Sequence, residues 1–325
     1  MLILNSLLSG SIEGLLWALL AMGVYISYRV LDFADLGVEG SIITGSSVTC
    51  LLIVKFGWNP FLATFVAIFA GGAAGLITGV LHTKLKIAPI LSGILTMTAL
   101  YSINIRIMGS SSITISGKDT IVTLLKGALG LTTQMTNLIV GLITVTLTLG
   151  GLYLFFGTQI GSSIRATGSN ERMCRAQGIN TDNAKILGLV LSNAVVAFAG
   201  AILVQCIWST SNYSYGVGTI VIGLASIIIG ETIFGFARSF WAKLLGITLG
   251  AVIYRAIITL IISTNFMSAS DLKLVTAIVV AVSLSIPTLK AKLGIGKRAS
   301  AAAPPAAPDE ASDTDAGESK GEKEV

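Results

Sequence analysis

Charged residues are scarce in this sequence. Asp, Glu, Lys and Arg make up only 11% of its 325 residues, whereas 53% are hydrophobic and the mean hydropathy is +0.86. Average soluble domains carry about 25% charged residues, so this composition excludes a soluble globular protein. Apolar stretches of roughly 20 residues, long enough to cross a bilayer core of about 30 Å, recur from residue 7 to residue 289. Because these stretches are apolar throughout, they predict helices rather than the strands of a barrel.

Residues that bind metals or carry out catalysis are also few. The chain has one histidine, His82, and three cysteines, Cys50, Cys174 and Cys206, without a CxxC pair. This usage argues against a disulfide framework and against a metal site built from His or Cys. The sequence contains no P-loop (GxxxxGK followed by Ser or Thr), no HExxH and no GxSxG motif. We therefore expect no metal, no cofactor and no enzymatic activity in this chain.

Apolar windows bounded by charges, glycine and proline predict an all-α polytopic membrane bundle of about 8 to 10 spans. The candidate spans are residues 6–28, 38–55, 60–83, 88–108, 135–157, 183–208, 216–237, 239–263 and 271–289. The segment 109–133 is expected to be an exposed loop with a short interfacial or re-entrant helix. From residue 299 onward the chain is rich in Ala and Pro and carries seven carboxylates, a composition typical of disordered segments. We therefore predict a transmembrane domain over residues 1–289 and a disordered tail over residues 290–325.

The basic residues assign the two sides of the membrane. Lys and Arg gather at residues 84–86, 165–185, 238–243 and 290–298, which the positive-inside rule places in the cytoplasm together with the C-terminus. Loops 209–215 and 263–270 contain neither Lys nor Arg and are expected outside. Alternation then places the N-terminus outside, an assignment that one missed half-span would reverse. Because the basic residues lie at span ends rather than in one patch, we do not expect a nucleic-acid partner despite the net charge of +5.

Charged residues within the apolar windows are few, and those inside them include Glu13, Arg106, Glu231 and Arg255. A charge at the bilayer centre costs about 2.5–3.5 kcal/mol, so each is expected to face the bundle interior or to lie near an interface. An ion-coupled carrier usually needs a buried carboxylate, which leaves Glu13 and Glu231 as candidates. Glu231 lies near a predicted cytoplasmic span end, where pairing with Arg238 is favoured over a role as a proton relay.

A short helix is predicted in the cytoplasmic loop that follows residue 165. Asn170 is a suitable N-cap, and Gly178 is placed to end the helix in the left-handed conformation. Glu171 and Arg175 have the i, i+4 spacing of an ion pair. A helix of about two turns is marginal alone in water and needs a surface to lean on. Its mixed face suits a partner protein, with an ordinary solvated loop as the alternative; the face consists of Arg172, Met173, Arg175, Ala176 and Ile179.

The residues around this helix follow a recognisable order: R-A-T-G-S-N, the short helix, G-I-N, and then a span with Ser, Ala and Gly at its centre. The residues that match are Arg165, Ala166, Gly168, Asn170, Gly178, Ile179, Asn180, Ser192, Ala199 and Gly200. Because these residues occur in this order, the loop resembles the coupling loop of bacterial ABC importer permeases of the branched-chain amino acid and ribose permease group. Residues 33–48 (FADLGVEGSIITGSSV) and 91–109 (LSGILTMTALYSINIRIMG) are similar to the subgroup associated with tryptophan and tyrosine uptake. The resemblance covers residues 7–287.

The resemblance implies the permease subunit of an ATP-driven importer in the bacterial inner membrane. Two permease copies, commonly identical, would enclose a pathway within the lipid, two cytoplasmic ATPases would receive the short helices, and a substrate-binding protein would deliver the cargo. The favoured cargo is an amino acid, preferably tryptophan-like. A ribose or nucleoside permease on the same scaffold and a stand-alone secondary carrier are the alternatives. The predicted ATPase contact consists of Asn170, Glu171, Arg172, Met173, Cys174, Arg175, Ala176, Gln177, Gly178 and Ile179.

Polar residues within or beside the spans are candidates for the substrate pathway. Glu39 follows Asp32 and Asp35 in a glycine-containing stretch. This stretch either forms a broken helix near the pathway or simply ends the first span at the cytoplasmic face. Ser102 and Asn104 either line the pathway or form hydrogen bonds between helices. The predicted pathway residues are therefore Glu39, Ser102 and Asn104.

Overall fold

The computed structural model describes residues 2–234, 239–263, 274, 276–278, 280, 281 and 285. The chain divides into the units Met1–Pro287 and Thr288–Val325, and the second unit lies outside the described residues. The predicted tail 290–325 and most of the predicted span 271–289 therefore also lie outside them.

Seven helices in the described part of the chain are long and apolar enough to cross a membrane. They contain α1 (Leu2–Tyr25), α3 (Pro60–Thr83), α4 (Pro89–Met108), α6 (Thr133–Gly157), α9 (Thr181–Leu203), α10 (Thr219–Phe234) and α11 (Phe240–Ser263). A shorter apolar helix, α2 (Val38–Val54), completes the set. Short π-helical turns extend α1 (η1, Ile26–Val30) and α9 (η2, Val204–Trp208). The predicted all-α membrane bundle is confirmed, and each predicted span up to residue 263 corresponds to one of these helices.

Local sequence signals explain where several helices begin. Asn59 precedes α3, and its side chain accepts a hydrogen bond from the Phe61 backbone N–H. Pro60 and Pro89 occupy the first positions of α3 and α4, where a missing N–H has no cost because that group has no partner within the helix. Thr132 caps α6 through the Met135 N–H. These caps set the helix boundaries that the apolar windows locate only approximately.

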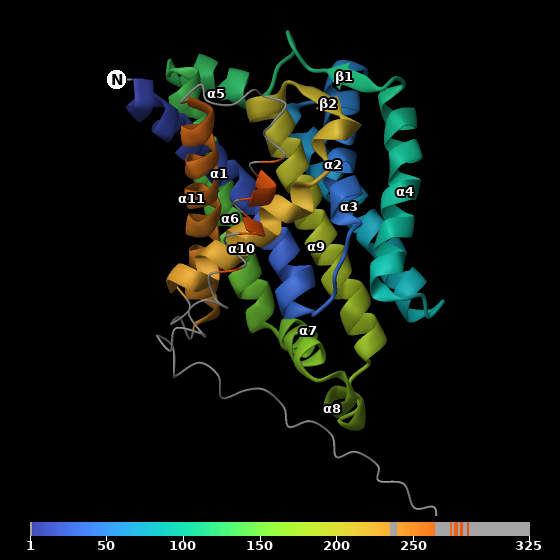
Figure 1. Cartoon of the computed structure of the whole chain (residues 1–325). Coiled ribbons are helices and arrows are strands. Elements are labelled where there is room, and N and C mark those ends of the chain that lie inside the picture. The colour runs from blue at the N-terminus through green and yellow to red at the C-terminus, as the bar shows by residue number, and fades with distance from the viewer. Residues whose placement is uncertain are drawn as a thin grey trace, which may run out of the picture. The chain divides into compact units, whose positions relative to one another are not determined.

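One end of the bundle carries two short strands and a short helix, which together form an outer platform. Strand β1 (Ser112–Thr114) pairs antiparallel with β2 (Thr210–Asn212), with Ser112 opposite Asn212. Helix α5 (Ile121–Leu129), which begins at a capping box on Thr120, is the short helix expected in segment 109–133. Figure 1 shows α5, β1 and β2 at the same end of the bundle as the start of α1, opposite α7 and α8. Loop 209–215, which sequence reasoning assigned to the outside, therefore shares one end with the start of α1, whereas loop 263–270 lies almost wholly outside the described residues.

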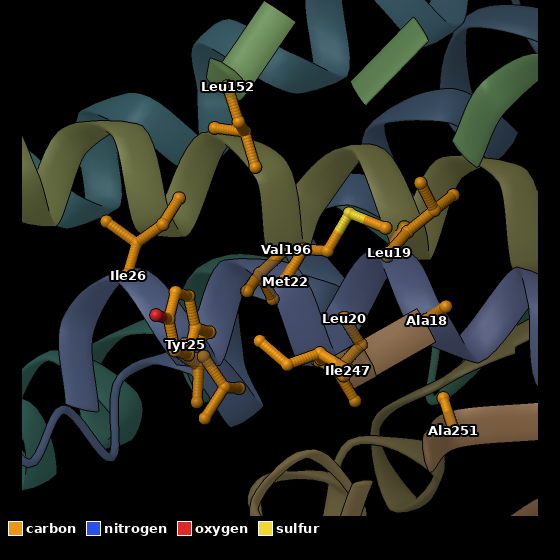
Figure 2. Close-up of a cluster of buried hydrophobic side chains, with 14 of the residues drawn as sticks. Ala18, Leu19, Leu20, Met22, Tyr25, Ile26, Leu152, Val196, Ile247 and Ala251 are labelled. Atoms are coloured by element: carbon orange, nitrogen blue, oxygen red, sulfur yellow. The ribbon is translucent and has the colours of Figure 1, made fainter. Parts of the chain in front are cut away.

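Helix α9 occupies the centre of the packing, in contact with α1, α2 and α3. Val196 of α9 lies beside Met22 of α1 in the largest buried cluster (Figure 2). On another face of α9, Gly200 approaches the Ile42 carbonyl of α2 so closely that an added Cβ would overlap it. Gly45 of α2 meets the Ala197 carbonyl in the same way. Small residues at these crossings let the backbones approach, as helix packing in lipid requires.

We predict that Gly200→Ala destabilises the protein, whereas Gly151→Ala does not. The new methyl at position 200 would meet backbone, which cannot move away easily, and overpacking of this kind costs about 1–3 kcal/mol. A methyl at Gly151 of α6 would meet nothing within 4 Å. Thermal unfolding in detergent should give a Tm several degrees lower for the first variant only. Equal melting temperatures for the two variants would contradict the close α2–α9 crossing.

Candidate functional site

Two consecutive helices form the loop between α6 and α9. Helix α7 (Gln159–Ser169) begins at the Thr158 cap, and α8 (Glu171–Ala176) follows after a single residue, Asn170. The predicted caps of α8 are confirmed, since Asn170 Oδ1 accepts from the Met173 N–H at 3.0 Å and Gly178 has φ +80°. The predicted Glu171–Arg175 pair is also present, at 2.8 Å. The apolar pattern did not predict α7, because this helix carries too many polar residues to resemble a span.

A network of charges fastens α8 to the first turns of α9. Lys185 Nζ donates to Glu171 Oε2 at 2.8 Å, while Arg175 reaches both Glu171 and, at 3.3 Å, Asp182. Arg175 Nε also donates to Thr181 Oγ1 at 2.8 Å. The hydrogen bond from Lys185, aided by the charges of Lys185 and Arg175, lowers the pKa of Glu171 below its ordinary value of 4.5. These contacts tie α8 to the start of α9.

The outer surface of α8 is open. Arg172, Met173, Ala176 and Gln177 are exposed, with 47% of the Met173 surface accessible. Cys174, in contrast, is fully buried, so its side chain supports the loop from within. The structure thus gathers the predicted contact residues in one short element and turns one of them inward.

Helix α7 attaches α8 to the rest of the bundle. Gly168 lies against the Val30 carbonyl of η1, too close for a side chain. The Arg165 guanidinium lies 5.7 Å from the centre of the Phe240 ring, at the start of α11. The α7–α8 loop therefore touches the ends of α1, α9 and α11.

The segment before α2 interrupts the helical structure between η1 and α2. Residues 31–37 form no helix, and α2 starts inside the bundle. Asp35, 1% exposed, accepts from the Gly37 N–H at 2.8 Å and from Asn193 Nδ2 of α9 at 2.7 Å. Asn193 Oδ1 in turn accepts from Ser41 Oγ at 2.6 Å. The structure thus shows a non-helical stretch between η1 and the short helix α2, and its place beside the pathway stays a prediction.

The three predicted pathway residues do not lie together. Glu39 is half-buried in the first turn of α2, and Asn104 is buried next to it, donating to the Gly40 carbonyl at 3.2 Å. Ser102 is on the exposed face of α4. The structure thus brings Glu39 and Asn104 together and leaves Ser102 apart.

Sequence reasoning missed Asp35 and Asn193 as a pair, and Lys185 as the partner of Glu171. The turn at Asp35 had a usable signal, because an Asp two residues before a Gly is typical of an Asx turn. The contact of Lys185 with Glu171 had none, because it is tertiary.

The two carboxylates considered for ion coupling are both in ion pairs. Glu13 of α1 binds Arg255 of α11 at 2.7 Å, and Glu231 of α10 binds Arg29 of η1 at 2.8 and 3.0 Å. The partner expected for Glu231, Arg238, lies outside the described residues. Both observed pairs join α1 to a helix of the C-terminal half, so they hold the bundle together.

Comparison with known proteins identifies the family. Residues 6–286 match the family described as branched-chain amino acid transport system, permease component, and the chain belongs to this family. It is a multi-pass membrane protein, the permease component of an ABC transporter. The chain is 38% identical to the tyrosine transport system permease protein of Clostridioides difficile over 89% of this chain and 94% of that protein. It is 25% identical to the ribose import permease protein of Escherichia coli K12, over 67% of this chain and 66% of that protein.

We predict that acid loosens α8 through Glu171. Because the pKa of this carboxyl is lowered by folding, its charge stabilises the loop above pH 4.5, and this stabilisation is lost as the pH falls through the lowered pKa. Hydrogen exchange of the Cys174, Gln177 and Ile179 amides, corrected for intrinsic rates, should speed up below pH 4.5.

Glu171→Gln should remove this pH dependence, and Arg172→Gln, a charge on the same helix outside the network, should retain it. If the Glu171→Gln protein kept the acid-induced opening, the network could not be its cause.

Proposed function

We propose that this chain is the membrane subunit of an ATP-driven importer for an amino acid, with an aromatic one favoured. The observation that carries the proposal is a short exposed helix, α8, fastened by charges to the central helix of a permease. A helix of this kind can receive force from a protein outside the membrane. The 38% identity to a tyrosine permease supports the aromatic cargo.

The proposed assembly contains this chain and three kinds of partner. Two cytoplasmic ATPases bind the α8 segments, from Asn170 to Ile179, and carry out the ATP hydrolysis. A second copy of this chain completes the pathway as a homodimer in the bacterial inner membrane. A substrate-binding protein docks outside, at the end that carries α5, β1 and β2. The C-terminal tail lies on the ATPase side.

The contacts of α9 supply a mechanism for coupling. Its first turns bind α8 through Lys185, and its centre binds the start of α2 through Asn193. Near its outer end, Gln205 donates to Thr64 of α3 at 2.8 Å and accepts from the Ile121 N–H of α5 at 3.1 Å. When the ATPases move α8, α9 carries that displacement as a rigid body to α2 and to the outer platform. This is the kind of element that alternates a pathway between two sides.

We predict that a bulky change on the open face of α8 uncouples the transporter. Ala176→Trp should lower ATP-dependent transport by about tenfold or more, because it obstructs the ATPase contact without touching the charge network. Glu171→Arg, which reverses one charge of the Glu171–Arg175 pair, should also abolish transport. The measurements are uptake by proteoliposomes with the complete complex and the yield of folded permease. Leu147→Trp, at an exposed site in the middle of α6, is the matched control. Wild-type transport by Ala176→Trp would contradict the role of α8.

We predict that the cognate binding protein binds tyrosine or tryptophan and that transport needs ATP. Calorimetric titration of the binding protein with aromatic amino acids, branched-chain amino acids and ribose decides the cargo. Tight binding of ribose alone would replace the amino acid by the sugar, for which the Escherichia coli relative is the argument. Ion-gradient-driven uptake by vesicles that contain only this chain would instead establish a secondary carrier.

A further inference from the structure

Two broken segments meet at the start of α2. From β2 the chain runs along α2 towards its first turn: the Ser211 hydroxyl hydrogen-bonds with Ser46 and Ser47, and Gly216 lies against the backbone of Glu39. The Gly218 N–H then donates to Glu39 Oε1 at 2.9 Å, just before α10 begins at Thr219. Helices α2 and α10 therefore both begin in the bundle interior, each after a non-helical segment.

The carboxylate of Glu39 is placed between these two helix starts. It belongs to the first turn of α2, and the hydrogen bond from Gly218 brings it to the beginning of α10. Helix N-termini carry partial positive charge, so the starts of both helices attract a negatively charged group. A carboxylate has about four lone-pair positions, so it can accept a ligand's N–H as well as the Gly218 amide. Glu39 is half-buried, so it remains within reach of a ligand.

An aromatic pair lies next to this carboxylate. Tyr213, in the segment between β2 and α10, lies close enough to Glu39 to interact with it electrostatically. Its ring meets that of Tyr101 of α4 edge to face, with centroids 4.5 Å apart. Tyr101 is 45% exposed, so the pair offers ring surface to an incoming molecule. Asn104, one turn further along α4, is fully buried beside Gly40, and its Oδ1 accepts no hydrogen bond within the described residues.

These groups suit one class of ligand. An ionised carboxylate binds an ammonium group, and tyrosine rings bind another ring by edge-to-face contact and an ammonium by a cation–π contact. An aromatic amino acid presents both groups about one side-chain length apart. A sugar has neither a positive charge nor an aromatic ring.

We propose that Glu39, Tyr101 and Tyr213 form a binding site for an aromatic amino acid within the permease, with Glu39 binding the amino group and the two tyrosines the ring. This inference rests on the proposed function and adds a specificity site to it. The cargo released by the binding protein pauses at this site, where the starts of α2 and α10 meet. Because Asn193 links the start of α2 to α9, movement of α8 changes the geometry of the site.

The test uses the complete complex of permease, ATPase and loaded binding protein in proteoliposomes. Glu39→Gln should lower uptake of labelled tyrosine or tryptophan by about tenfold or more, because it removes the charge that binds the amino group. ATP hydrolysis stimulated by the loaded binding protein should remain, since it depends on assembly and on α8. Tyr213→Phe keeps the ring and should transport normally, whereas Tyr213→Leu should resemble Glu39→Gln. Glu13→Gln and Tyr153→Leu, a carboxylate and an aromatic-pair tyrosine elsewhere in the bundle, are the matched controls.

Ligand binding provides a second measurement that does not depend on a variant. Saturation-transfer NMR on the complex in nanodiscs should detect tyramine, which keeps the amine and the ring, and not 3-(4-hydroxyphenyl)propionate, which lacks the amine. Equal signals from both compounds, or full uptake by Glu39→Gln, would overturn the site while leaving the importer intact. Absence of any amino acid uptake by the wild-type complex would instead overturn the proposed function.

Discussion

The structure depends on how one interruption of backbone is satisfied inside the membrane. Residues 31–37 form no helix, and lipid supplies no partners for backbone polar groups, so such a segment survives only where protein or a water-filled cavity satisfies it. Asp35 accepts from the Gly37 amide and from Asn193, and Asn193 accepts from Ser41. For these bonds to form, α9 must approach α2 within backbone contact, which explains the glycines at positions 45 and 200. The break therefore determines where α9 lies, and α9 in turn touches most of the bundle.

Helix α9 is central in the described part of the protein, and hydrogen bonds join it to α8, to α2 and to the outer platform. In the proposed mechanism it is the element that links the two ends. Contacts alone do not establish coupling, which requires an element with two arrangements that both ends bias. In the proposed mechanism the start of α2 is that element, since it is joined to α9 by the hydrogen bonds of Asn193 with Ser41 and Asp35.

Local rules predicted local structure well. The cap at Asn170, the pair of Glu171 with Arg175 and the left-handed Gly178 are all short-range, and all three are present. Spans were predictable because a continuous apolar stretch in lipid has few alternatives to a helix. Strands β1 and β2 were not predicted, since each has only three residues and pairs with a partner about a hundred positions away. Lys185 was missed for the same reason. Tertiary contacts between distant segments carry no periodicity that one sequence could display.

The few charges in the apolar helices support the proposal that the energy for transport comes from a partner protein. Placing a charge at the bilayer centre costs about 2.5–3.5 kcal/mol on insertion scales, so a protein keeps one only where it has a partner or a task. Glu13 and Glu231 have arginine partners on other helices, and breaking either pair to move a proton would leave a guanidinium behind. Such pairs are suited to holding helices together. Glu39 accepts a hydrogen bond from the backbone amide of Gly218 at the start of α10, which places its carboxylate between two helix starts. In the proposed importer a site at this place binds and releases cargo, and the work of alternation enters through α8.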